Sequence, residues 1–263
     1  MNILFIGDIV GKPGRRSVAY WLPRLREEFA VDLVIANGEN AAAGLGITAA
    51  LVRELLEDGI QVITLGNHTW RRREFAKAID DFETVVRPAN YAEGVPGKGA
   101  VVYQFADARK AGVVNLLGRI YMEPMACPFA VGARAVEELR QATPVVIVDM
   151  HAEATSEKIA MGWHLDGKCT AVIGSHTHVQ TADERLLPGG TAYITDVGMT
   201  GPLDSVIGMQ REPIVRRFLT GIPVQFKVAR ERPALAAVVI EADEETGKAR
   251  SITRLLREDP PND

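Results

Sequence analysis

Short apolar runs recur along the chain, rich in β-branched residues and without polar alternation. Each is about four to six residues long and stops at glycine or at a polar side chain. Strands covered on both faces, as in the sheets of α/β proteins, have this pattern. The runs begin at Ile3, Leu33, Val62, Val145, Ala171 and, less regularly, Tyr193. We therefore predict buried strands at these positions.

Segments with helical spacing of apolar residues lie between these runs. A helix is predicted over residues 17–29, with Pro23 causing a kink or a late start. Residues 48–58 are predicted to form a helix that Thr48 caps and Gly59 ends. Two shorter helices are predicted, over residues 73–79 and 131–140.

Further strand-like segments occupy the middle and the end of the chain. They span residues 99–105, 112–117, 224–229, 235–241 and 251–255, the first two as a pair and the third with the alternation of a half-buried strand. No repeat or Ser/Gly-rich linker divides the sequence. The simplest interpretation is a single α/β domain over residues 1–263, with two sheets between helices and a flexible tail in the final EDPPND.

Composition excludes several classes of protein. The 263 residues are 47% hydrophobic and 24% charged, as in an ordinary globular protein. No apolar stretch reaches 18 residues, so no membrane helix is expected, and the first run meets Asp8 too early for a signal-peptide core. We therefore expect a cytoplasmic protein. Its two cysteines are isolated, which favours reduced thiols over a zinc or redox motif.

The net charge of −4 indicates what kind of partner the chain binds. Binding to long nucleic acid by phosphate neutralisation normally requires a basic excess. A small anionic substrate can still be attracted by a local positive site. We expect a small phosphodiester or nucleotide as partner, and neither long nucleic acid nor a membrane.

Polar residues with metal-binding side chains follow five of the apolar runs. In open α/β sheets the carboxyl ends of the strands border one crevice, where ligands bind. These residues are Asp8, Glu39 with Asn40, Asn67 with His68, His151, and His176 with His178. Each alone has an ordinary explanation as a cap, a turn former or a structural histidine. Their recurrence at five strand ends predicts a shared metal site.

The residue types suit particular ions. Imidazole together with carboxylate and amide oxygen favours manganese, iron or zinc. His176 and His178 are two residues apart, which in a strand would place both rings on one face. His164 follows none of these runs and is expected to lie outside the site.

Other catalytic motifs are incomplete in this sequence. Residues 7–13, GDIVGKP, resemble a phosphate-binding loop, but they are one residue short and have proline where serine or threonine would bind magnesium. A GxSxG motif is absent, which disfavours a serine hydrolase.

The series GD…GEN…GNH…H…GSHTH resembles the calcineurin-like metallophosphoesterases. Val10 stands where that family has its first histidine, Glu39 replaces the usual bridging aspartate, and GNHTW replaces GNHD. With the opening GDIVGKPGR and residues 195–209, these departures resemble the YmdB-like phosphodiesterases of bacteria. The resemblance implies a calcineurin-like fold of two mixed sheets sandwiched between helices.

The resemblance also implies roles for the site residues. It makes Glu39 a bridge between two divalent ions, iron or manganese first and zinc as an alternative. It places Asp8, Asn40 and His178 on one ion, and Asn67, His151 and His176 on the other. It makes His68 the acid that protonates the leaving alkoxide, in the hydrolysis of 2′,3′-cyclic nucleotides.

Several alternatives stay open at this point. The basic run Arg71, Arg72 and Arg73 is either a solvated face or a source of phosphate contacts. The chain could instead be a phosphomonoesterase, or a regulatory protein that binds metal and nucleotide with little turnover. The resemblance is also compatible with a homo-oligomer.

Overall fold

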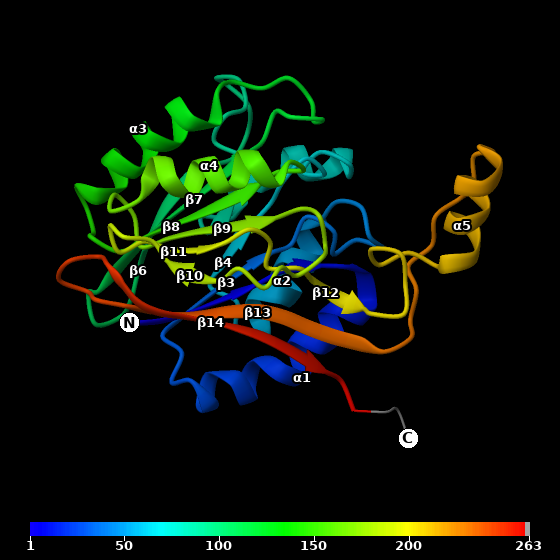
Figure 1. Cartoon of the computed structure of the whole chain (residues 1–263), viewed down its shortest axis with the longest axis horizontal. Helices are drawn as coiled ribbons and strands as arrows, with labels where there is room; N and C mark the ends of the chain where they lie inside the picture. The colour runs from blue at the N-terminus through cyan, green and yellow to red at the C-terminus, as the bar shows by residue number, and fades with distance from the viewer. Residues whose placement is uncertain (261–263) are drawn as a thin grey trace.

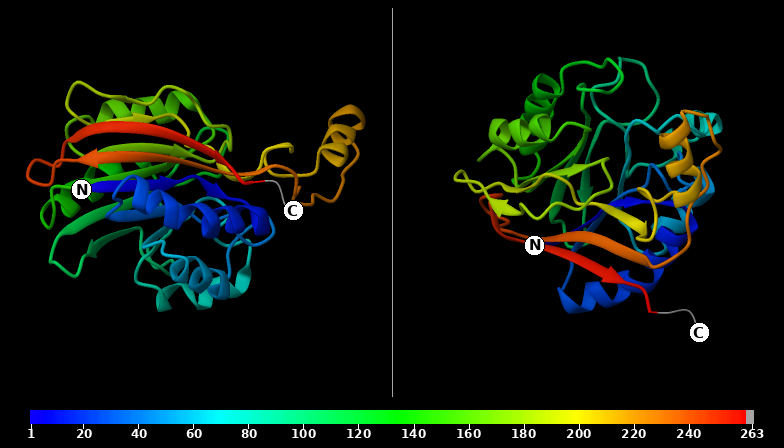
Figure 2. Two further views of the ribbon diagram at one scale, coloured as in Figure 1. Left: turned by 90° about the horizontal axis from the view of Figure 1, so that it is seen from below. Right: turned by 45° about the vertical axis from the view of Figure 1, so that its right-hand side comes forward.

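Two β-sheets packed face to face form the centre of the molecule (Figure 1), in a computed structural model that describes residues 1–260. Helices cover the outer face of each sheet, as the two further views show (Figure 2). Among the described residues, no helix is both long enough and apolar enough to cross a membrane.

The first sheet is built from both ends of the chain. Its order is β2-β12-β13-β1-β3-β4-β5, with β14 paired to β13. Strands β1, β3, β4 and β5 run parallel, and β13 is antiparallel to β1. The strands are β1 (Asn2–Ile6), β2 (Asp8–Ile9), β3 (Leu33–Asn37), β4 (Val62–Thr64), β5 (Val85–Val86), β12 (Met199–Pro202), β13 (Pro233–Ala242) and β14 (Ala249–Glu258).

The second sheet comes from the middle of the chain. Its order is β10-β11-β9-β8-β7-β6, and β7, β8, β9 and β11 run parallel. The strands are β6 (Ala100–Gln104), β7 (Lys110–Leu117), β8 (Val146–His151), β9 (Ala171–Ser175), β10 (Arg185–Leu186) and β11 (Ala192–Ile194). In both sheets, predicted site residues lie at or just after the carboxyl ends of parallel strands, namely β3, β4, β8 and β9.

The core has three apolar layers. Phe5 and Ile35 of the first sheet meet Val113, Ile147 and Ile173 of the second in the central layer. On the outer face of the first sheet lie α1 (Gly11–Glu28) and α2 (Ala49–Glu57). On the outer face of the second lie α3 (Pro128–Arg140) and α4 (Thr155–Leu165). Burial on both faces explains why the strands are continuously apolar.

The predicted α/β architecture with two sheets between helices is confirmed, as are the mid-chain strand pair and the helix capped by Thr48. The Leu51 N–H donates to Thr48 Oγ1 at 3.3 Å. Helix α1, however, begins at Gly11, six residues before the predicted start, and contains Pro23. The prediction missed this start because residues 11–16 are polar or basic and lack helical spacing of apolar residues. Pro13 is nevertheless compatible with a helix start, where proline is well tolerated.

Other expectations for secondary structure were wrong. The segment predicted as a helix over residues 73–79 is two short 3₁₀ helices, η1 (Arg73–Lys77) and η2 (Ile79–Asp81). Helix α4 was not predicted, because its apolar face is weakly marked. Residues 224–229 form no strand; they belong to an arm that extends from the body with α5 (Arg211–Thr220) (Figure 1). Among residues 1–260, the segment makes only one isolated bridge, between Val228 and Met209, so its alternation did not produce a strand.

The predicted flexible tail lies partly outside the described residues. Glu258 is the last residue of β14. The carboxylate of Asp259 accepts hydrogen bonds from Ser17 Oγ at 2.9 Å and Trp21 Nε1 at 3.0 Å.

Candidate metal centre

The carboxyl ends of the parallel strands of both sheets meet at one edge of the molecule. The first sheet provides its residues in β2 and in the turns after β3 and β4, and the second provides them at the end of β8 and just after β9. All seven predicted ligands are brought together there: Asp8, Glu39, Asn40, Asn67, His151, His176 and His178.

One group of side chains surrounds the amide of Asn40. Its Nδ2 lies 3.5 Å from Asp8 Oδ1, 3.3 Å from Glu39 Oε1 and 3.1 Å from His178 Nε2. His178 Nδ1 donates to the carbonyl oxygen of Ile207 at 2.9 Å. Since a carbonyl only accepts, the proton of a neutral His178 is on Nδ1, and Nε2 presents a lone pair to the group.

A second group surrounds the ring of His151. Its Nε2 lies 3.1 Å from each of three atoms: Glu39 Oε1, Asn67 Oδ1 and His176 Nδ1. His176 Nε2 lies 3.1 Å from the Glu153 carboxylate, which accepts a hydrogen bond from the Nε2–H. The lone pair of His176 Nδ1 therefore faces His151. Glu39 therefore contacts both groups.

This donor set fits a cation better than it fits a proton. The ligand atoms of Glu39, His151 and His176 all lie within 4.8 Å of one another. A single hydrogen on His151 Nε2 can serve only one of its three neighbours, whereas a metal ion can accept lone pairs from several donors at once. Imidazole, carboxylate and amide oxygen are ligands of borderline and hard divalent ions.

The electrostatics of these side chains indicate that the cluster favours positive charge. Burial opposes the charge on Glu39, yet the adjacent His151 and His68 hold the pKa of its carboxyl well below the usual range. Burial likewise disfavours a charged His151, yet Glu39 raises its pKa to about 9. Burial, reinforced by His151, lowers the pKa of His176 to about 3, which keeps that ring neutral. A metal ion would take the place of the proton beside Glu39.

The ring of His151 is oriented by residues that the sequence analysis missed. His151 Nδ1 lies 2.9 Å from Ser175 Oγ, which in turn donates to Asp149 Oδ1 at 2.6 Å. Asn37 Nδ2 donates to the other oxygen of Asp149 at 3.4 Å. The signal was present in the sequence, because all three are polar residues within or at the end of otherwise apolar strands and so require buried partners.

The loop after β9 corrects one expectation. Strand β9 ends at Ser175, so His176 and His178 do not share the face of a strand. Both have left-handed backbones, with φ of +98° and +66°. Such conformations are strained in residues other than glycine and persist only where the surroundings impose them.

Two buried residues impose that conformation. The Asp196 Oδ2 accepts hydrogen bonds from the Thr177 N–H at 3.0 Å and the Thr177 hydroxyl at 2.7 Å. Lys158, fully buried on α4, donates to the same oxygen at 2.6 Å. The carboxylate of Asp196 therefore supports the turn at Thr177.

His68 and Gly66 lie in the turn after β4. The His68 N–H donates to Glu39 Oε2 at 2.8 Å, and its Nδ1 lies 2.7 Å from Asn40 Oδ1. The Nε2 atom of His68 is therefore the ring nitrogen available to contact a ligand. A side chain at Gly66 would collide with the His151 ring and the Glu39 carboxylate, so only glycine allows the strand end to approach so closely.

The three arginines of the basic run, residues 71–73, differ in their contacts. Arg72 donates from Nη2 to Ala42 O at 2.8 Å and from Nε to Leu45 O at 3.1 Å, which ties down the loop after Asn40. Arg71 and Arg73 are exposed. His164 is exposed on α4, where its ring contacts Phe129, and it lies outside the cluster as expected.

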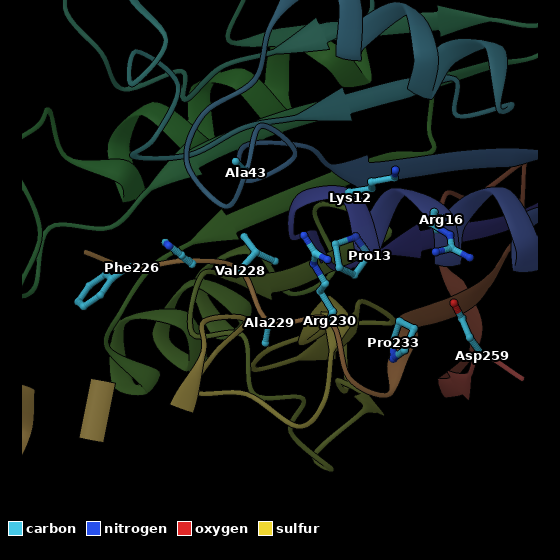
Figure 3. A pocket seen from close by; sticks show the side chains of 11 residues that line it. Lys12, Pro13, Arg16, Ala43, Phe226, Val228, Ala229, Arg230, Pro233 and Asp259 are labelled. Carbon is cyan, nitrogen blue, oxygen red and sulfur yellow. The ribbon is translucent and has the colours of Figure 1, made fainter. Parts of the chain in front are cut away.

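A separate cavity of about 570 Å³ lies beside the start of α1 and does not include the cluster (Figure 3). Lys12, Arg16 and Arg230 are among its lining residues. Its volume exceeds that of the cavities at the cluster, but it contains none of the predicted ligands.

The chain belongs to the family of YmdB-like proteins, whose model matches residues 4–255. It is 50% identical over 259 residues to the 2′,3′-cyclic-nucleotide 2′-phosphodiesterase of Bacillus subtilis (strain 168), covering 98% of both chains. The resemblance identified from the sequence is thereby confirmed.

Two crystal structures have the same overall fold. A hypothetical protein from Thermus thermophilus is 43% identical, with a TM-score of 0.92 over 99% of this chain and 100% of the other. A novel phosphatase from Mycoplasma pneumoniae is 37% identical, with a TM-score of 0.90 over 99% of this chain and 95% of the other.

Proposed function

We propose that this protein is a metal-dependent phosphodiesterase that hydrolyses 2′,3′-cyclic nucleotides. The observation that carries the proposal is the cluster around Glu39, with two groups of donors that share one carboxylate. The activity named for the Bacillus subtilis relative supports the choice of substrate. We also propose that the two sheets and their helices form the calcineurin-like metallophosphoesterase fold, as one domain.

The proposed ligands divide into two sets that share Glu39. The first set adds Asp8, Asn40 and His178, and the second adds Asn67, His151 and His176. In the structure Asn40 Nδ2 faces Asp8 and His178. A half-turn of the amide would bring Oδ1 to that position, where it could act as a metal ligand of the first set. We propose iron or manganese as the ions, with zinc as the alternative, because all three accept this mixture of nitrogen and oxygen ligands.

Two divalent cations held by these residues would supply an activated water nucleophile and electrostatic stabilisation of the phosphoryl oxygens. Asp8 and Glu39 together contribute about two negative charges, against about four positive charges from the ions. The loaded site therefore keeps a positive excess that attracts a phosphodiester anion. Burial of both carboxylates strengthens this attraction, since little water screens it.

His68 is proposed to donate the proton to the leaving alkoxide. Asn40 Oδ1 accepts from its Nδ1 at 2.7 Å, and the half-turned amide would instead donate from Nδ2; either contact orients the ring. Its side chain is 21% exposed, which leaves it accessible to a substrate. A general acid in this position contributes about 10²–10⁴ in rate.

Metal analysis of anaerobically purified protein, paired with an assay of three substrates, tests the proposal. We expect about two ions per chain, and faster turnover of 2′,3′-cyclic AMP than of bis-p-nitrophenyl phosphate or p-nitrophenyl phosphate. Preference for the monoester would favour a phosphomonoesterase. Tight nucleotide binding with negligible turnover would favour a regulatory protein.

A variant pair isolates the role of His68. His68→Ala should lower kcat by about 10²–10⁴ while the metal content stays full. His164→Ala, which removes an exposed histidine outside the cluster, is the matched control and should leave kcat unchanged. Normal turnover in a fully loaded His68→Ala variant would eliminate the acid role.

A further inference from the structure

The loop between β7 and α3, residues 118–127, begins beside the metal centre. Leu117, the last residue of β7, is paired in register with His151 on the parallel strand β8. The Gly118 N–H donates to the His151 carbonyl at 2.9 Å. The chain therefore leaves the second sheet at the edge where the proposed ligands lie.

Both ends of this loop are fastened to the body. Asn90 Nδ2 donates to the carbonyls of Leu117 at 2.8 Å and Ala126 at 3.0 Å. The buried carboxylate of Glu157 accepts from the Arg119 N–H at 3.1 Å. The loop tip is thus held in a defined position relative to His151.

Tyr121 lies at the tip of this loop in an energetically unfavourable conformation. Its backbone is left-handed, with φ of +60°, and its side chain is 91% exposed. A strained backbone that presents a large aromatic ring to water is expected where the ring has a ligand to contact. Tyrosine suits such a role, since it offers a large flat surface with few rotatable bonds.

Tyr121 borders a cavity of about 290 Å³ that reaches the metal centre. The loop contributes Tyr121, Met122 and Glu123 to its lining, and the metal centre contributes Asn67 and His176. The base of a 2′,3′-cyclic nucleotide is separated from its phosphate by a single ribose. A phosphate at the metal centre therefore places the base within reach of this cavity.

We propose that Tyr121 is the platform on which the nucleobase of the substrate stacks, in the cavity beside Asn67 and His176. The inference rests on the proposed function, because it takes the phosphate to be at the metal centre. Stacking is available to every base, so the site selects nucleotides over other phosphodiesters without choosing strongly among bases.

The experiment compares 2′,3′-cyclic AMP with methyl riboside 2′,3′-cyclic phosphate, which has the same reacting group but no base. Tyr121→Ala should raise KM for 2′,3′-cyclic AMP about five- to a hundredfold, the usual effect of losing one base–aromatic contact. Values of kcat, metal content and KM for the base-free substrate should stay unchanged. Tyr121→Phe keeps the ring and should restore KM to within about twofold, as stacking requires only the π-face.

Two features allow the effect of Tyr121→Ala to be assigned to the loss of the ring. Alanine and tyrosine are both strained at positive φ, so the substitution leaves the backbone preference of the loop largely unaltered. Trp163→Ala is the control, since it removes another exposed aromatic residue from the outer side of α4. Equal KM changes for both substrates, or none for either, would overturn the base-stacking role.

Failure of the proposed function would give a different result. If the wild-type protein hydrolysed neither substrate, the stacking role would be judged from equilibrium binding of 3′-AMP and ribose 3-phosphate to the metal-loaded protein. Loss of the affinity advantage of 3′-AMP in Tyr121→Ala would support the role. An advantage that survived in this variant would contradict it.

Discussion

The end of β8 and the loop after β9 each bring histidine to the same cluster, but by different physical means. His151 is the last residue of a buried strand, fully enclosed, and its ring is oriented by Ser175 on the neighbouring strand. His176 and His178 lie beyond the end of their strand on left-handed backbones. Their conformation depends on the Asp196 carboxylate and on Lys158 behind it.

This difference shows that the sheet and a side chain on the adjacent strand place one ligand, whereas two ligands on a tight turn need support from residues of other elements. The strand receives its support from the sheet ladder, which many hydrogen bonds share. The turn depends on one ion pair and the hydrogen bonds to Thr177. We therefore expect the turn to be the more vulnerable region, and the following changes test that expectation.

Glu39→Ala should have the largest effect, because both regions converge on this carboxylate. Losing a bridging ligand removes more than the roughly 10–100-fold in metal affinity or activity that an outer-shell partner contributes, so activity should fall at least about 10³-fold. Metal content and turnover of 2′,3′-cyclic AMP measure the outcome. A variant that kept both ions would refute the sharing of Glu39.

His151→Ala and His178→Ala should each lower the metal content from about two ions to about one. The two variants remove donors from different proposed sets, so each should spare the other set. Elemental analysis of dialysed protein gives the stoichiometry. Complete metal loss in both variants would mean that the two sets do not bind independently.

Asp196→Asn should weaken metal binding about 10–100-fold, although Asp196 is not a proposed ligand. The amide keeps the size of the side chain but removes the negative charge that faces Lys158 and Thr177. Metal titration with an activity readout measures the shift. Asp204→Asn is the matched control, because Asp204 pairs with Arg232 in an exposed ion pair; equal behaviour of the two variants would remove the distinction between turn and strand.

Ser175→Ala should have the smallest effect, about tenfold at most on metal affinity. It removes the hydrogen bond to His151 Nδ1, but burial and the sheet still hold the ring. The same titration measures it. A loss as large as that of Asp196→Asn would show that the strand end depends on its side-chain support as much as the turn does.

Much of the fold could be predicted from local pattern. Buried strands such as β3 and β8 are mostly apolar, because they are covered on both faces. The Thr48 cap has a local chemical cause and was predictable for that reason. Residues 224–229 show the limit: they alternate like a strand but find no partner along most of their length.

The proposed ligands were identifiable because polar residues at the carboxyl ends of parallel strands lie at the same edge of the sheet. Their supports were not identifiable in the same way. Lys158 lies in a helix, 38 positions from Asp196, and nothing near it in the sequence indicates a buried ion pair. Tyr121 resembles any loop aromatic until its exposure and backbone conformation are known.

The sequence by itself determined which segments are buried strands and which side chains end them, since hydrophobic periodicity and side-chain chemistry are local properties. Only the tertiary structure decided how those ends divide into two groups around Glu39 and which tautomers their hydrogen-bond partners favour. It also decided what holds the turn at Thr177. These depend on contacts between residues far apart in the chain, and such contacts form only once both sheets have packed together.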